Sequence, residues 1–146
     1  MDRIKFIKTC GGACLGALGF GMLSIGCTST KMVSAPLEKD QLLVPVSEFE
    51  LEKKGGTGHH PYLILRNTAL AFPVYVYRFA DGAFKALLMR CTHQGTELQA
   101  FGDKLQCPAH GSVFDNQGEV TNGPASHNLR EFPVTVDDQL LKISLK

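Results

Sequence analysis

The sequence predicts an all-β fold, either an antiparallel β-sandwich or a small barrel. From Leu42 onward, apolar runs of about four to eight residues recur between turn signals, as in chains built from short strands. No stretch of this region holds a helical period long enough to indicate a helix. With 146 residues, 44% of them apolar, one compact domain is expected, and a second catalytic domain has no room.

The clearest predicted element is a hairpin formed by residues 74–79 and 84–89. The turn between them contains Asp81-Gly82, and glycine tolerates the positive φ that a tight hairpin requires. Successive side chains of a strand point to opposite faces. The first strand should therefore place aromatic side chains on one face and valines on the other, namely Tyr75, Tyr77 and Phe79 against Val74 and Val76.

The same pattern predicts the remaining strands, at residues 42–46, 62–66, 97–101, 129–134 and 140–145. Turns are expected at Gly102-Asp103 and at Asp137-Asp138. The glycine-rich segment that ends in His59-His60 is expected to form a solvated loop. Five phenylalanines are expected in the core: Phe72, Phe79, Phe84, Phe101 and Phe132.

The charge balance argues against nucleic acid as a partner. Lys and Arg number 15 and Asp and Glu number 14, so no basic excess is available to neutralise a phosphate backbone. The chain has no strongly acidic segment either. Net charge therefore does not identify what the folded part binds.

The first residues are typical of an export signal. Arg3, Lys5 and Lys8 precede an apolar stretch, and no further charged residue occurs before Lys31. This charged and then apolar order predicts a signal peptide over residues 1–26, with an uncleaved N-terminal membrane anchor as the alternative. The segment Leu-Ser-Ile-Gly-Cys that ends at Cys27 resembles a bacterial lipobox, which implies a lipidated Cys27.

The segment that follows Cys27 shows no sustained periodicity and contains Pro36. Residues 27–41 are therefore expected to be a lipidated N-terminus and tether, and residues 42–146 the folded domain. These features together predict an exported protein that is anchored in a membrane and faces the periplasm. Its export route and its choice between inner and outer membrane are left open.

The candidate chemistry lies in two short Cys-and-His motifs. Of five cysteines, those at positions 10, 14 and 27 fall in the predicted export and lipid signals, which leaves Cys91 and Cys107 in the domain. Cys91 begins a C-x-H motif with His93, and Cys107 begins a C-x-x-H motif with His110. Two thiolates and two imidazoles suit zinc or an iron-sulfur cluster. Structural zinc sites usually pair Cys with Cys and His with His, so one of each on both motifs favours the cluster.

These motifs resemble those of the Rieske iron-sulfur proteins, over roughly residues 42–146. The resemblance is carried by Cys-Thr-His-Gln-Gly-Thr at 91–96 and by Cys-Pro-Ala-His-Gly-Ser at 107–112, followed by Val-Phe-Asp. Gly-Pro-Ala at 123–125 resembles the proline loop that covers the cluster in that family. The resemblance implies a Rieske-like sandwich or barrel with a two-loop cluster-binding subdomain.

The resemblance also implies the ligands of a Rieske-type 2Fe-2S cluster. Cys91 and Cys107 would hold the buried iron, while His93 and His110 would hold the outer iron at the tip of the domain. Ser112 stands where the family hydrogen-bonds a bridging sulfide. With two neutral imidazoles the oxidised cluster is formally neutral, whereas four thiolates would make it a dianion. Adding an electron to the neutral cluster then takes less electrostatic work than adding one to a dianion. Mixed-ligand clusters accordingly have reduction potentials of roughly −150 to +300 mV, against about −400 mV for all-Cys plant-type clusters.

Several positions depart from the high-potential members of the family. Thr96 and Ala109 stand where the cytochrome bc proteins carry the cysteines of a disulfide clip, so no clip can form. Gln94 replaces the Leu usual in quinol-docking members, and Phe114 replaces a Tyr that donates to a Cys sulfur. Fewer donors stabilise the reduced cluster less, which predicts a middling reduction potential.

The sequence thus predicts a membrane-tethered protein that transfers single electrons through a Rieske-type cluster. It would be an electron carrier rather than an enzyme, with redox proteins as partners. One alternative is a Rieske subunit of a larger quinol or oxyanion oxidoreductase. The other, from a different class, is a zinc-stabilised binding module without a redox role. An aromatic-ring oxygenase is excluded, because its mononuclear iron needs a large second domain.

Overall fold

The computed structural model describes residues 30–53 and 56–146. The predicted signal peptide, its two cysteines and Cys27 lie outside the described residues. Within the described part of the chain, no helix has the length and apolarity needed to cross a membrane.

The described residues form short strands and one turn of 3₁₀ helix, η1 (Val46–Phe49). The strands are β1 (Lys31–Ser34), β2 (Leu37–Glu38), β3 (Gln41–Pro45), β4 (Glu50–Lys53), β5 (Gly56–His59), β6 (Tyr62–Arg66), β7 (Val74–Arg78), β8 (Phe84–Leu88), β9 (Gln99–Phe101), β10 (Lys104–Gln106), β11 (Val113–Asp115), β12 (Val120–Asn122), β13 (Glu131–Phe132), β14 (Val134–Asp137) and β15 (Leu140–Ser144). The all-β prediction is confirmed.

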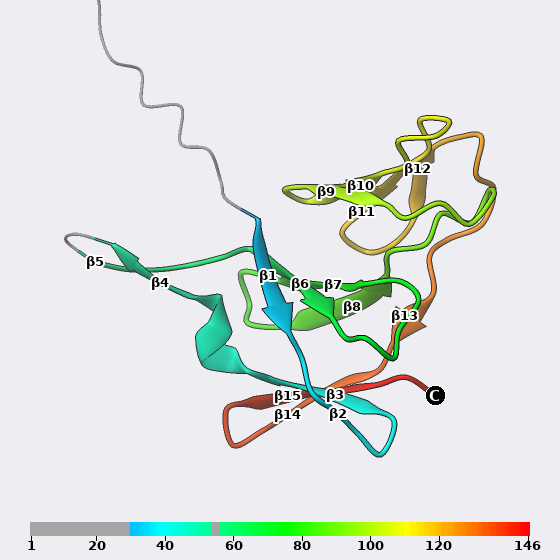
Figure 1. The fold of residues 1–146 in the computed structure, drawn as a ribbon. Helices are drawn as coiled ribbons and strands as arrows, with labels where there is room; N and C mark the ends of the chain where they lie inside the picture. The colour runs from blue at the N-terminus through cyan, green and yellow to red at the C-terminus, as the bar shows by residue number, and fades with distance from the viewer. Residues whose placement is uncertain (1–29, 54–55) are drawn as a thin grey trace, which may run out of the picture.

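The larger sheets form three layers (Figure 1). A five-stranded sheet in the order β1-β6-β7-β8-β13 lies in the middle. The sheet β14-β15-β3-β2 covers one face of it, and the sheet β12-β11-β10-β9 lies over the other (Figure 1). A separate two-stranded ladder joins β4 and β5. The pairing is antiparallel except between β1 and β6, which run parallel.

Strand β7 runs between two hydrophobic clusters, one on each face of the middle sheet. Val74 and Val76 belong to the cluster shared with β3 and β15, whereas Tyr75 belongs to the cluster shared with β10 and β11. Tyr77 packs against the second cluster. The predicted alternation of aromatic and valine faces is therefore confirmed, and both faces are buried because a sheet lies over each.

The predicted hairpin is present as β7 and β8, with a turn of a different type. The N–H of Phe79 donates to the Ala83 carbonyl at 2.9 Å, so three residues form the loop. Gly82 has a φ of 85°, and Asp81 does not have a positive φ. Instead, the Asp81 carboxylate accepts the N–H of Ala83 at 2.9 Å. Such three-residue loops place one left-handed residue after a type I turn, so only the glycine is needed there.

The prediction that residues 27–41 form a tether differs from the structure over the described part of that segment, because strand β1 begins at Lys31. Strand β1 pairs with β6 along its whole length, and the N–H of Ala35 continues the pairing with the Arg66 carbonyl at 3.0 Å. Ala35 is buried, and Val33 and Leu37 pack against the core. A strand of four residues shows too little alternation to be predicted from sequence. Its extended conformation depends instead on pairing with β6.

Two further expectations are wrong. Phe101, which is expected in the core, lies on β9 at the edge of its sheet and is 58% exposed. Of the four other phenylalanines, Phe132 is buried, and the remaining three are partly buried. The segment before His60, which is expected to be a loop, forms strand β5. His60 itself is buried, and its backbone N–H donates to the Phe49 carbonyl at 2.7 Å.

Candidate metal centre

The two Cys-and-His motifs fold into loops with the same backbone hydrogen bonds. Loop 1, residues 91–96, follows β8. In it the N–H of Cys91 donates to the Thr96 carbonyl and the N–H of Gly95 donates to the Cys91 carbonyl, both at 2.8 Å. Loop 1 therefore turns back on itself within five residues of its cysteine.

Loop 2, residues 107–112, connects β10 and β11 and repeats this pattern. The N–H of Cys107 donates to the Ser112 carbonyl at 2.8 Å, and the N–H of Gly111 donates to the Cys107 carbonyl at 3.0 Å. Gly95 and Gly111 have φ values of 77° and 79°, a left-handed conformation that is costly for residues with a Cβ. The shared Gly position thus follows from the shared loop geometry.

The four predicted donors converge from these loops. Cys91 and Cys107 are free thiols, 2% and 1% exposed, inside the hydrophobic cluster below the loops. His93 and His110 are exposed, and their ring centroids lie 5.0 Å apart at an interplanar angle of 85°. Two soft donors therefore lie inside the domain and two imidazoles at its surface.

The local backbone prepares Cys107 to act as a ligand. Burial alone raises the pKa of the Cys107 thiol, but backbone hydrogen bonds from His110 and Ala109, with smaller contributions from the side chains of Cys91 and Thr96, outweigh it and hold the pKa below its ordinary value. The thiolate is the form that binds metals. The electrostatics of loop 2 thus favour the ligating form.

A third segment, residues 123–127, fastens the two loops together. The buried Ser112 hydroxyl oxygen accepts the N–H of Ala125 at 3.0 Å, which ties this segment to loop 2. The Thr92 hydroxyl donates to the His127 carbonyl at 2.6 Å, which ties it to loop 1. The segment begins with a cis peptide bond between Gly123 and Pro124.

Sequence reasoning did not find two of the residues that hold these loops. Besides Thr92, the Asn122 side-chain amide donates to the Gly111 carbonyl at 3.1 Å and to the Gly123 carbonyl at 3.0 Å. Thr and Asn side chains commonly bond to backbone groups in loops, but their distant partners are set by the fold. His127, which supplies the carbonyl bonded by Thr92, is exposed.

The donor set fits a binuclear iron-sulfur centre. Thiolate and imidazole are the ligands of the mixed 2Fe-2S cluster, which takes two cysteines on one iron and two histidines on the other. Two buried sulfurs beside two exposed, adjacent imidazoles match that division. Among residues 30–53 and 56–146, no three His, Cys, Asp or Glu side chains are grouped as ligands for one metal ion.

A comparison with models of protein families identifies the family of this chain. Residues 47–133 match the model of the Rieske 2Fe-2S domain. The chain belongs to the Rieske family. Its cofactor is accordingly a Rieske-type 2Fe-2S cluster, and its function is that of a Rieske electron-transfer domain.

Curated relatives place the Rieske domain in two kinds of protein. Iron-sulfur subunit 2 of the cytochrome b6-f complex from Trichormus variabilis is 29% identical over 82% of this chain and 62% of its own length. The oxygenase component of dicamba O-demethylase from Stenotrophomonas maltophilia is 38% identical over 54% of this chain and 26% of its own. The chain therefore spans less than two thirds of either relative.

Solved structures agree on the fold. The plasma membrane Rieske protein of the cyanobacterium Synechocystis PCC 6803 superposes with a TM-score of 0.51 and 26% identity, over 57% of this chain and 86% of that protein. Naphthalene 1,2-dioxygenase, at 18% identity, shares the fold over 73% of this chain and 26% of its own, with a TM-score of 0.54.

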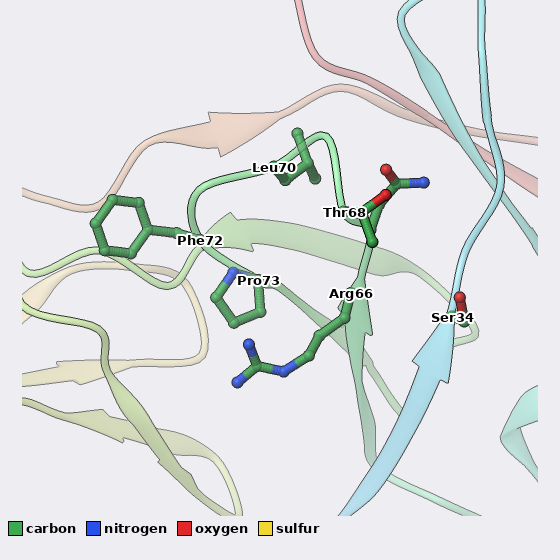
Figure 2. Close-up of a pocket in the computed structure, with 7 residues that line it drawn as sticks. Ser34, Arg66, Thr68, Leu70, Phe72 and Pro73 are labelled. Atoms are coloured by element: carbon green, nitrogen blue, oxygen red, sulfur yellow. The ribbon is translucent and has the colours of Figure 1, made fainter.

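A cavity of about 280 Å³ lies away from the candidate ligands, at the ends of β1 and β6 (Figure 2). Figure 2 shows the Arg66 side chain extending past Pro73, while the Phe72 ring points away from Arg66. Arg66 is already paired with Glu97. Because none of the Cys or His candidates lines this cavity, it does not belong to the metal centre.

Proposed function

We propose that this Rieske protein is a one-electron carrier that is exported and tethered to a membrane on its periplasmic side. The observation that carries the proposal is the exposed imidazole pair of His93 and His110 beside two buried thiols. The bound cluster would supply a one-electron redox couple. Electron exchange needs a short path to a partner, and the two rings form the part of the ligand set that a partner can reach.

Each candidate side chain has a distinct role in this proposal. Cys91 and Cys107 would hold the inner iron from within the hydrophobic cluster below the loops. His93 and His110 would hold the outer iron and form the exit for electrons at the surface. The Ser112 oxygen already accepts the Ala125 N–H, so its own hydrogen is free to donate to a bridging sulfide.

We expect a middling reduction potential. Thr96 and Ala109 carry no clip cysteines, and the buried Phe114 has no hydroxyl to donate to a sulfur. Protein-film voltammetry should place the potential below that of quinol-oxidising Rieske proteins and above the roughly −400 mV of all-Cys plant-type clusters. A potential at either extreme would contradict this reasoning.

Spectroscopy of the reduced protein tests the ligand set. Anaerobically prepared protein should contain iron and acid-labile sulfide and give the low average g value of mixed-ligand iron. His110→Gln should lose this signal, while His59→Gln, a change at another exposed histidine, should keep it. A wild-type protein that is EPR-silent and holds stoichiometric zinc would instead identify a zinc-stabilised binding module.

The proposed location depends on residues 1–26 as a signal peptide and on Cys27 as the lipid attachment site. Labelled palmitate should enter the wild-type protein and not Cys27→Ala. Membrane association of Cys27→Ala without any lipid label in the wild type would support an uncleaved anchor.

A second candidate function is that of a subunit in a larger quinol or oxyanion oxidoreductase. It is favoured by the relative from the cytochrome b6-f complex, which aligns with 82% of this chain. Mild crosslinking in membranes followed by purification distinguishes the two. A stable, stoichiometric complex with a catalytic subunit would support the second candidate, and a freely exchanging protein would support the carrier.

A further inference from the structure

A groove of about 470 Å³ borders loop 1 beside His93. Arg90 and Arg130 are its charged lining residues, and none of the residues that line it is acidic. Gln94, also in the lining, is exposed and uncharged. One of the two exposed imidazoles therefore lies at the wall of a cationic groove.

The two guanidinium groups are held by contacts that do not neutralise them. The Cζ atom of Arg90 lies 5.6 Å from the centroid of the Phe72 ring, and that of Arg130 lies 4.8 Å from the Phe132 ring. Arg130 also donates one hydrogen bond to the Leu145 carbonyl at 2.8 Å. Aromatic rings and a carbonyl fix the position of an arginine while its charge is retained.

Nearby carboxylates are engaged elsewhere. Glu97, whose backbone bridges to Arg90, pairs with Arg66, and Glu131, which follows Arg130, pairs with Lys85 at 2.8 Å. Among the described residues, neither Arg90 nor Arg130 forms an ion pair. Two exposed and positioned guanidinium groups thus keep their charge at the edge of the metal centre.

We propose that this groove docks an acidic surface patch of a redox protein partner. Asp or Glu carboxylates of the partner accept hydrogen bonds from Arg90 and Arg130, and this contact places His93 against the partner. The inference rests on the proposed function, in which the imidazoles form the exit for electrons. Complementary charge at such a site raises the rate of productive encounter and fixes the orientation of the two proteins.

The test measures binding of the cluster-loaded protein to immobilised poly-L-glutamate by biolayer interferometry, with poly-L-lysine as the opposite surface. The double variant R90Q/R130Q should bind poly-L-glutamate about tenfold more weakly at about 10 mM salt, and the difference should vanish near 1 M salt, where charges are screened. Electron transfer to a gold electrode coated with poly-L-glutamate should slow in parallel.

Two variants control for structural effects. Arg78→Gln removes another arginine that stacks on a phenylalanine, 5.9 Å from the Phe84 centroid, in a different groove, and it should bind like the wild type. The variant R90K/R130K retains both charges without the planar stacking group. It should recover most of the binding if charge is the cause, and none of it if the stacking geometry is the cause.

Each outcome separates the inference from the proposed function. Equal binding by wild type and R90Q/R130Q, or an equal loss in Arg78→Gln, overturns the docking surface. Saturable binding of free citrate by the groove with no preference for poly-L-glutamate overturns it as well, because the groove would then hold a small anion. A wild-type protein without iron and sulfide overturns the proposed function instead.

Discussion

Replacing Ser112 with alanine should loosen the segment that fastens the two loops. The Ser112 oxygen is the acceptor for the N–H of Ala125 at 3.0 Å, and both residues are buried. Alanine removes that acceptor without opening space for a water molecule to replace it. The N–H of Ala125 is then left without a partner in the interior.

An unpaired buried donor costs about 1–3 kcal/mol. With a urea dependence of about 2 kcal/mol per molar for a small domain, a loss of about 2 kcal/mol lowers the midpoint of urea unfolding by about 1 M. A loss of about 2 kcal/mol also raises the hydrogen-exchange rate of the Ala125 amide roughly 30-fold, because about 1.4 kcal/mol corresponds to a factor of ten.

The assay compares Ser112→Ala with Thr121→Val in the cluster-loaded protein. Thr121 also bonds to a backbone carbonyl, that of Val113 at 3.2 Å, but its side chain is exposed. Its loss should change stability by less than about 0.5 kcal/mol. Urea midpoints give the global effect, and exchange measured by mass spectrometry on a peptide that contains Ala125 gives the local one.

A Ser112→Ala midpoint equal to that of Thr121→Val, together with unchanged exchange at Ala125, would refute this account of the fastening bond. The variant also tests the proposed donation to the cluster. Loss of a donor destabilises the reduced state, so the reduction potential should fall. A lower potential with unchanged exchange would assign Ser112 to the cluster alone.

Two further predictions concern the packing and the pH response. Gly118→Ala should lower the free energy of unfolding by about 2–4 kcal/mol, because φ is +83° there and an added Cβ would lie 2.8 Å from the buried Leu87 Cδ2. Gly82→Ala is the control: its φ of +85° is similar but the space around it is open, so it should cost about 1 kcal/mol. Equal costs in urea unfolding would contradict the clash with Leu87. Burial, and to a smaller extent the positive charge of Lys31, lowers the pKa of His60 below its ordinary value of 6.5. Below pH 6.5 the unfolded chain therefore binds a proton at His60 more readily than the folded protein does, and the free energy of unfolding falls. The urea midpoint of wild type relative to His60→Gln should therefore drop as pH falls from about 7.5 to about 5.5, and a constant difference would contradict it.

Strands that coincide with an apolar run of five or six residues between turn signals could be predicted from sequence to within a residue or so. Residues 62–66 form β6 as expected, and the expected strand at 140–145 is β15 at Leu140–Ser144. The expected strand at 129–134 is divided instead between β13 and the start of β14, which belong to different sheets. Alternation indicates an extended backbone, but it does not show which neighbour a strand pairs with.

Short strands could not be predicted, because their local signal is too weak. Strands β10, β11 and β12 have three residues each, and they are stable because they pair with one another over the second hydrophobic cluster. The same holds for β1, whose four residues extend along β6. In these segments tertiary contacts override propensity.

Most of what points to the cofactor is already visible in the residue pattern: two Cys-and-His motifs with 13 residues between His93 and Cys107, a glycine where each loop turns back, and short apolar runs that indicate strands. These are local properties, since ligand type, spacing and backbone freedom belong to neighbouring residues. The fold, in contrast, sets how residues 123–127 bond to both loops, and how Glu97 and Glu131 pair away from Arg90 and Arg130. Those facts depend on distances between residues far apart in the chain, which the packing of three sheets sets and local pattern does not encode.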